Sequence, residues 1–159
     1  MSGLARFQAG NVDEAGKLRL NWHDDQRIVV YKITNGERTT FDTWARLAVE
    51  IIRAWHPSQR YLALHDISHP GIALQYSSFS RNILLPAVTE EATASIQDVV
   101  GDTERFQASI ALVVSSQFSG YLTNTMAQLE SYRRQFQNLS FKVFADENTA
   151  LGWLRSHLS

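Results

Sequence analysis

The segment Tyr61-Leu62-Ala63-Leu64-His65-Asp66-Ile67 decides the fold class of this chain. Apolar residues occupy most of its positions, with little alternation between apolar and polar side chains, whereas a strand with one solvated face alternates. A strand that is apolar on both faces is typical of a sheet covered by helices on both sides, and such sheets are built from parallel strands. We therefore expect 61–67 to be a central, parallel strand.

Upstream of this strand, the sequence predicts a hairpin. Leu18, Leu20 and Trp22 alternate with polar residues, which is the pattern of a strand with one buried face. A short turn at 24–26, where aspartate is well suited, leads into a β-branched strand over 27–33.

A helix is expected between the hairpin and the central strand. Thr39 or Thr40 is its predicted N-cap, and Pro57 follows it as a stop. Its apolar residues recur at helical spacing and form one stripe that faces a core: Phe41, Trp44, Leu47, Ala48, Ile51, Ile52 and Trp55.

Downstream, helices alternate with strands to the end of the chain. A helical segment interrupted by Pro86 precedes a strand over 106–114, and a long amphipathic helix leads to a short strand over 141–144. Asp146 is the predicted N-cap of the last helix. This alternation implies parallel pairing through right-handed crossovers. We predict an α/β fold in the order ββαβαβαβα, a mixed β-sheet of about five strands with helices packed against it.

Length and glycine content predict one domain preceded by an arm. The 159 residues suit a single domain, which we place at 17–159, and the polar, glycine-containing segment 1–16 reads as a loosely held N-terminal arm. Leu4 and Phe7 are apolar residues within this polar arm and are expected to dock in a groove. They could cover the exposed edge of their own sheet or that of a twofold mate, and we expect a homodimer.

Composition excludes several classes of protein. Fifteen Lys and Arg against 16 Asp and Glu give a formal net charge of −1, too little positive charge for binding driven by nucleic-acid phosphates. The absence of cysteine excludes disulfides, thiolate metal sites and a cysteine nucleophile. No apolar run reaches the length of a membrane span, and the first residues lack a secretory apolar run, so we expect a cytoplasmic protein.

The C-terminal segment resembles a known family. Phe141-Lys142-Val143-Phe144-Ala145-Asp146-Glu147, then Ala150-Leu151 and Trp153-Leu154, are similar to the closing motif of SpoIIAA-like proteins, the fold family of STAS domains. The strand at 61–68 resembles the third strand of that family, and the resemblance covers roughly 18–158. It implies a SpoIIAA-like α/β fold and a regulatory, protein-binding role.

Regulatory STAS domains carry an Asp-Ser motif after the third strand, and a partner kinase phosphorylates its serine. Here Ser77 and Ser78 lie near the corresponding helix start, but no Asp precedes them and no Gly follows. The chain therefore resembles an uncharacterised branch for which the family implies a fold and no chemistry. If phosphorylation occurs, we expect it on Ser77 or Ser78, with Arg81 as the pairing cation.

Two functions from different classes remain open. The first is a non-enzymatic regulatory or protein-interaction module that binds its partner with the loops after the third and fourth strands. The second is a domain that binds a small molecule or lipid in a groove at the carboxyl edge of the sheet. The expected binding surface contains Asp66, Ser68, His69, Phe79, Arg81, Ser115, Ser116, Phe118 and Tyr121.

The sequence predicts neither a catalytic site nor a metal site. His65, Asp66 and His69 form the densest polar cluster, but Pro70 ends the strand, so the two histidines share no face. Asp66 is expected to accept backbone N–H groups at the strand end. Ser115 or Ser116 lacks the Gly-x-Ser-x-Gly context of a hydrolase nucleophile. We predict no catalytic residue, no metal and no cofactor.

Overall fold

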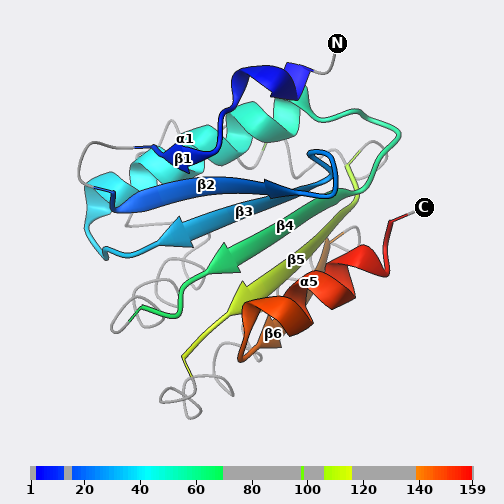
Figure 1. Ribbon diagram of the computed structural model, residues 1–159. Helices are drawn as coiled ribbons and strands as arrows, with labels where there is room; N and C mark the ends of the chain where they lie inside the picture. The colour runs from blue at the N-terminus through cyan, green and yellow to red at the C-terminus, as the bar shows by residue number, and fades with distance from the viewer. Residues whose placement is uncertain (1–2, 13–15, 70–97, 99–105, 116–138, 159) are drawn as a thin grey trace.

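Figure 1 shows the computed structural model of the chain, which describes residues 3–12, 16–69, 98, 106–115 and 139–158. Within these ranges a six-stranded mixed sheet is the centre of the molecule, and its strands lie side by side in chain order. The strands are β1 (Gly10–Asn11), β2 (Leu18–His23), β3 (Ile28–Ile33), β4 (Tyr61–Asp66), β5 (Ala108–Val113) and β6 (Leu139–Phe144). In the described ranges, no helix has the length and apolar character needed to cross a membrane.

The predicted α/β class is confirmed, and β4 is a central strand as expected. It pairs in parallel with β3 on one side and β5 on the other, and all six of its residues are buried. β5 pairs in parallel with β6, whereas β2 and β3 form the predicted antiparallel hairpin. The strand ends differ from the predicted ones by up to two residues, because pairing with a neighbour rather than local pattern ends a strand.

The predicted count of about five strands is wrong, because the N-terminal arm contributes a sixth. Gly10 pairs with Leu20, and the Val12 N–H donates to the Leu18 carbonyl at 2.9 Å. A short 3-10 helix, η1 (Gly3–Arg6), lies against the helix α1 (Arg38–Ala54). Leu4 and Phe7 are buried in the core of their own subunit. The arm thus covers its own sheet edge, which is one of the two alternatives expected for it.

Two helices cover opposite faces of the sheet (Figure 1). The side chains of α1 join one core cluster with Tyr31 and Ala63, and α5 (Glu147–Arg155) joins a second cluster with Val30 and Leu64. Successive strand residues point to opposite faces, so each inner strand supplies both clusters. The helices predicted between 77 and 136 lie outside the described residues, apart from Asp98, which is helical.

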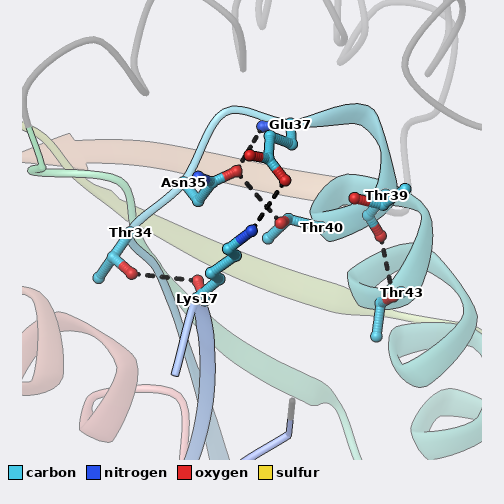
Figure 2. A network of polar contacts seen from close by, with 7 residues as sticks. All are labelled: Lys17, Thr34, Asn35, Glu37, Thr39, Thr40 and Thr43. Carbon is cyan, nitrogen blue, oxygen red and sulfur yellow. Dashed lines mark hydrogen bonds and ion pairs between the residues drawn. The ribbon is translucent and has the colours of Figure 1, made fainter. Parts of the chain in front are cut away.

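The start of α1 differs from the predicted cap at Thr39 or Thr40. The N-cap is Glu37, whose side chain makes no capping hydrogen bond. Figure 2 shows the reason: Asn35 Oδ1 accepts the Glu37 backbone N–H at 2.7 Å and the Thr40 hydroxyl at 3.3 Å, so this turn ends the strand and begins the helix earlier. The Lys17 ammonium binds the Glu37 carboxylate at 2.9 Å and links β2 to the same turn.

The predicted cap of the last helix is confirmed. Asp146 Oδ1 accepts the Thr149 N–H at 2.8 Å, and both of its oxygens accept the Thr149 hydroxyl. These hydrogen bonds stabilise the ionised form, the backbone bond most, and hold the pKa of the Asp146 carboxyl below its usual value.

Candidate functional site

The carboxyl edge of β4 and β5 contains the part of the expected binding surface that the structure describes. Asp66 is aligned with Val113 on the neighbouring strand, and Ser68 and Ser115 each lie two residues beyond. His69 is exposed after the end of β4. The other expected contact residues, and both candidate phosphorylation sites, lie outside the described residues: Phe79, Arg81, Ser116, Phe118 and Tyr121, with Ser77 and Ser78.

Asp66 serves the fold at this edge, as the sequence predicts. Its Oδ1 accepts the Ser68 backbone N–H at 3.0 Å and the Ser68 hydroxyl at 2.6 Å. The side chain is also buried. Because this carboxylate orders the turn that leaves β4, it fixes the direction in which the chain departs from the sheet.

His65 lies on the opposite face of β4 from Asp66. Its ring is packed edge-on against the rings of Tyr31 and Trp44, with centroids 5.6 and 5.1 Å away. Burial lowers the pKa of His65 to about 3, because the charged ring would be desolvated. Neighbouring strand residues point to opposite faces, so His65 and Asp66 cannot form a His–Asp pair. In the parts of the chain that the structure describes, no three His, Cys, Asp or Glu side chains gather as metal ligands.

A buried polar pair lies further along the face of the sheet that holds His65. The hydroxyls of Tyr31 and Tyr61 are 2.9 Å apart and satisfy each other. Burial raises the pKa of both phenols well above the usual value. Both side chains therefore stay neutral, and the pair ties β3 to β4 within the core.

The polar network at the start of α1 also belongs to the carboxyl edge, since it follows directly after β3 (Figure 2). Its groups bind one another: the Lys17 ammonium lowers the pKa of the Glu37 carboxyl by hydrogen bonding and by charge. The Thr34 hydroxyl contacts the Lys17 carbonyl at 3.3 Å, and the Thr43 hydroxyl donates to the Thr39 carbonyl at 2.8 Å. This network orders the entry into the helix.

A pocket lies at the other end of the strands, and the sequence reasoning missed it. It encloses about 60 Å³ at the amino edge of β3 and β4, beside the end of α5. Basic and neutral polar side chains dominate the described part of its wall, which contains Arg27, Trp55, Ser58, Gln59, Arg60, Leu62, His157 and Leu158.

The fold holds the wall of this amino-edge pocket in place. Arg60 Nη1 donates to the Ser109 hydroxyl at 3.1 Å, so β5 anchors the guanidinium. The Trp55 indole N–H donates to the Arg60 carbonyl at 3.3 Å, and the Trp55 ring stacks on Trp22 and meets Tyr61 edge-on. On the other side, Arg155 of α5 binds Asp24 of the hairpin turn at 2.8 Å.

His157 is the third basic group of the pocket. Burial and the nearby Arg60 charge both lower the pKa of its ring. Its Nε2 atom is buried and has no hydrogen-bond partner in the described part of the chain.

One sequence signal could have located this pocket. Arg27 begins one predicted strand and Arg60 directly precedes the next, and parallel neighbours bring their amino ends to the same edge. The position of His157 had no comparable signal, since it depends on how α5 crosses the sheet.

Comparisons of the chain with models of protein families, with curated proteins and with solved structures each find no match.

Proposed function

We propose that the chain is a non-enzymatic interaction module that binds a protein partner by strand addition at β6. The observation that carries this proposal is the inequality of the two sheet edges. The edge strand β1 is only two residues long and belongs to the N-terminal arm. The strand at the other edge, β6, is six residues long and pairs with β5 alone among the described strands. A long outer strand presents backbone donors and acceptors that an extended peptide can use.

The side chains of β6 support such a role. Phe141, Val143 and Phe144 are only partly buried, and they pack against the two cores. The Lys142 ammonium lies 5.5 Å from the centre of the Phe144 ring and is exposed. An exposed lysine discourages unselective pairing and favours a partner strand with an acidic residue opposite it.

The backbone alternation tells which groups face a partner. The Phe144 carbonyl accepts from Val114 of the β5 segment, so the peptide groups of Phe144, Lys142 and Ser140 point toward β5. Those of Phe141 and Val143 point outward. The N–H group of Val143 is thus a donor that strand addition would use.

The use of the carboxyl-edge groups supports a non-enzymatic role. Asp66 is engaged by Ser68, and His65 is buried on the other face of the strand. The alternative is a small molecule or lipid held at this edge by Phe79, Phe118 and Tyr121. It stays a prediction, because these three residues lie outside the described part of the chain. Phosphorylation of Ser77 or Ser78 also stays a prediction, because both serines lie outside the described residues.

Two substitutions at one position test the proposal. Val143→Pro removes one outward donor, and a proline is tolerated in an outer strand because the bonds to β5 remain. Val143→Ala is the matched control, because it shortens the side chain and keeps the N–H. A photo-cross-linking residue at Ser140 first identifies the partner, and calorimetry with the purified partner then measures the affinity of each variant.

We expect Val143→Pro to lose at least about tenfold in affinity while Val143→Ala binds nearly as the parent does. Equal binding by Val143→Pro and the parent, with native circular dichroism, would refute strand addition at β6. The expected homodimer is tested with the same variants, because a second copy pairing at β6 would appear as a doubled mass in light scattering that Val143→Pro abolishes.

A further inference from the structure

We propose that the amino-edge pocket binds a small phosphate-bearing molecule through Arg27, Arg60 and His157. The pocket lies at the opposite end of the strands from Asp66, and no residue of β6 lines it. The proposal is therefore independent of partner binding at β6.

The size of the pocket selects a compact ligand group. Its volume of about 60 Å³ is several times the roughly 10–15 Å³ that a cavity needs to hold one water. Sites for cofactors and drug-sized ligands have volumes of about 300 Å³ or more. A single phosphate group fits this volume, and the remainder of an ester would extend out of the opening.

The charge of the pocket selects an anion. Among the residues that the structure describes, two arginines and a histidine line it, and none of the lining residues is acidic. Arg60 is close enough to His157 to disfavour a positive charge on that ring. A bound dianion would offset this repulsion, because it places negative charge between groups of like sign.

The donors come from three separate elements. Arg27 ends the hairpin turn, Arg60 precedes β4, and His157 follows α5. The two contacts that hold Arg60, to the Ser109 hydroxyl and the Ala108 carbonyl, both use Nη1. Within the described part of the chain, Nε and Nη2 of Arg60 can therefore bind a ligand, and an arginine fork suits phosphate oxygens.

His157 contributes the third basic side chain of the pocket wall. Its Nε2 is buried and lacks a hydrogen-bond partner in the described residues, although buried polar atoms are nearly always paired. Donors that line one pocket from three elements suit the tetrahedral oxygens of a phosphate better than a planar carboxylate.

Calorimetry with three probes tests the proposal. Inorganic phosphate, methyl phosphate and acetate are titrated into the full chain at constant ionic strength, and tryptophan fluorescence provides a second readout, since Trp55 lines the pocket. The variants are Arg27→Gln, Arg60→Gln and His157→Phe. Arg19→Gln is the matched control, because it removes the same charge from an exposed position near the far end of β3.

We expect both phosphates to bind and acetate to bind at least about tenfold more weakly. Each pocket variant should lose about tenfold or more in phosphate affinity, whereas Arg19→Gln should bind as the parent does. Tighter binding of methyl phosphate assigns an ester as the ligand, and tighter binding of the inorganic ion assigns free phosphate; both results support the proposal.

Three results would overturn it: no heat and no fluorescence change up to about 10 mM phosphate, equal affinity for acetate and phosphate, or equal loss in Arg19→Gln and the pocket variants. Arg60→Gln also loses the anchor on Ser109, so circular dichroism checks its fold. If Arg60→Gln does not fold, His157→Phe decides the outcome, because it keeps an aromatic ring packed against Trp153; Arg27→Gln is used after the same circular-dichroism check.

Discussion

Replacement of His65 by leucine should remove a large part of the acid sensitivity of this fold. The His65 ring is 5 % exposed, and burial lowers its pKa from 6.5 to about 3. In the unfolded chain the ring is hydrated and takes up a proton near pH 6.5. Between these two values the unfolded state binds more protons than the folded state, so stability rises with pH.

The size of the effect follows from the separation of the two pKa values. The contribution of His65 is complete above about pH 6.5 and is lost as the pH falls toward 3. At about pH 5 the loss spans 1.5 pH units, which corresponds to about 2 kcal/mol, and at about pH 4 it reaches about 3 kcal/mol. A domain of this kind has only about 5–15 kcal/mol of stability, so the loss is measurable.

Urea unfolding followed by tryptophan fluorescence, at several pH values between 7 and 4, measures this contribution. His65→Leu should flatten the dependence of unfolding free energy on pH by about 2 kcal/mol between pH 7 and 5. His65→Phe keeps a ring between Tyr31 and Trp44 and serves if the leucine variant does not fold. Ile51→Val is the control, because it should cost about 1 kcal/mol at every pH. Parallel pH profiles for the parent and both His65 variants would refute the reasoning.

Other predictions concern particular contacts. Asp146→Ala should lower the melting temperature at neutral pH, and Asp146→Asn should lower it less. Because the pKa of this carboxyl is lowered in the folded state, its contribution to stability is present above the usual pKa of 3.8 and should vanish in acid, which calorimetric scans at several pH values can check. Tyr31→Phe should lower the free energy of unfolding by about 1–3 kcal/mol, because it leaves the buried Tyr61 hydroxyl without its partner. The double variant with Tyr61→Phe should be nearly as stable as the parent, and additive effects in the double-mutant cycle would contradict this coupling. Gln26→Gly should raise the unfolding free energy by about 0.5–1 kcal/mol, because Gln26 is held at a φ of 62°; a loss of stability would mean that its 3.5 Å contact with the Leu4 carbonyl matters more than the strain. Phe7→Ala should cost about 3 kcal/mol in a urea titration at any protein concentration, since Phe7 packs in its own subunit; a cost that depends on concentration would instead place the arm on a second copy.

Local sequence pattern was sufficient for the parts of the fold whose cause is local. The continuous apolar run at 61–67 predicted a central parallel strand, and β4 is buried along its whole length. The alternation at Leu18, Leu20 and Trp22 predicted a strand with one inner face. Asp146 was predicted as a cap, and the N–H that it accepts is only three residues away. In each case the determining residues lie within a few positions of one another.

Competition between local signals was harder to resolve. Thr39 and Thr40 are both good N-caps, yet α1 begins at Arg38 because Asn35 forms the turn first and the Lys17–Glu37 pair holds it. The arm posed the same difficulty. Leu4 and Phe7 indicated docking, but their burial on their own subunit depends on the groove between β2 and α1, which exists only after the hairpin and helix have packed.

The sequence by itself determined the α/β class, the hairpin, the central strand and the structural use of Asp66. The tertiary structure decided which charged groups meet. Arg27, Arg60 and His157 lie far apart along the chain, and they line one pocket because β3 and β4 pair in parallel and the end of α5 lies at their amino edge. The physical reason is that strand register and helix placement minimise the free energy of the whole core. No short segment contains that information, so the convergence of these side chains cannot be read from any local pattern.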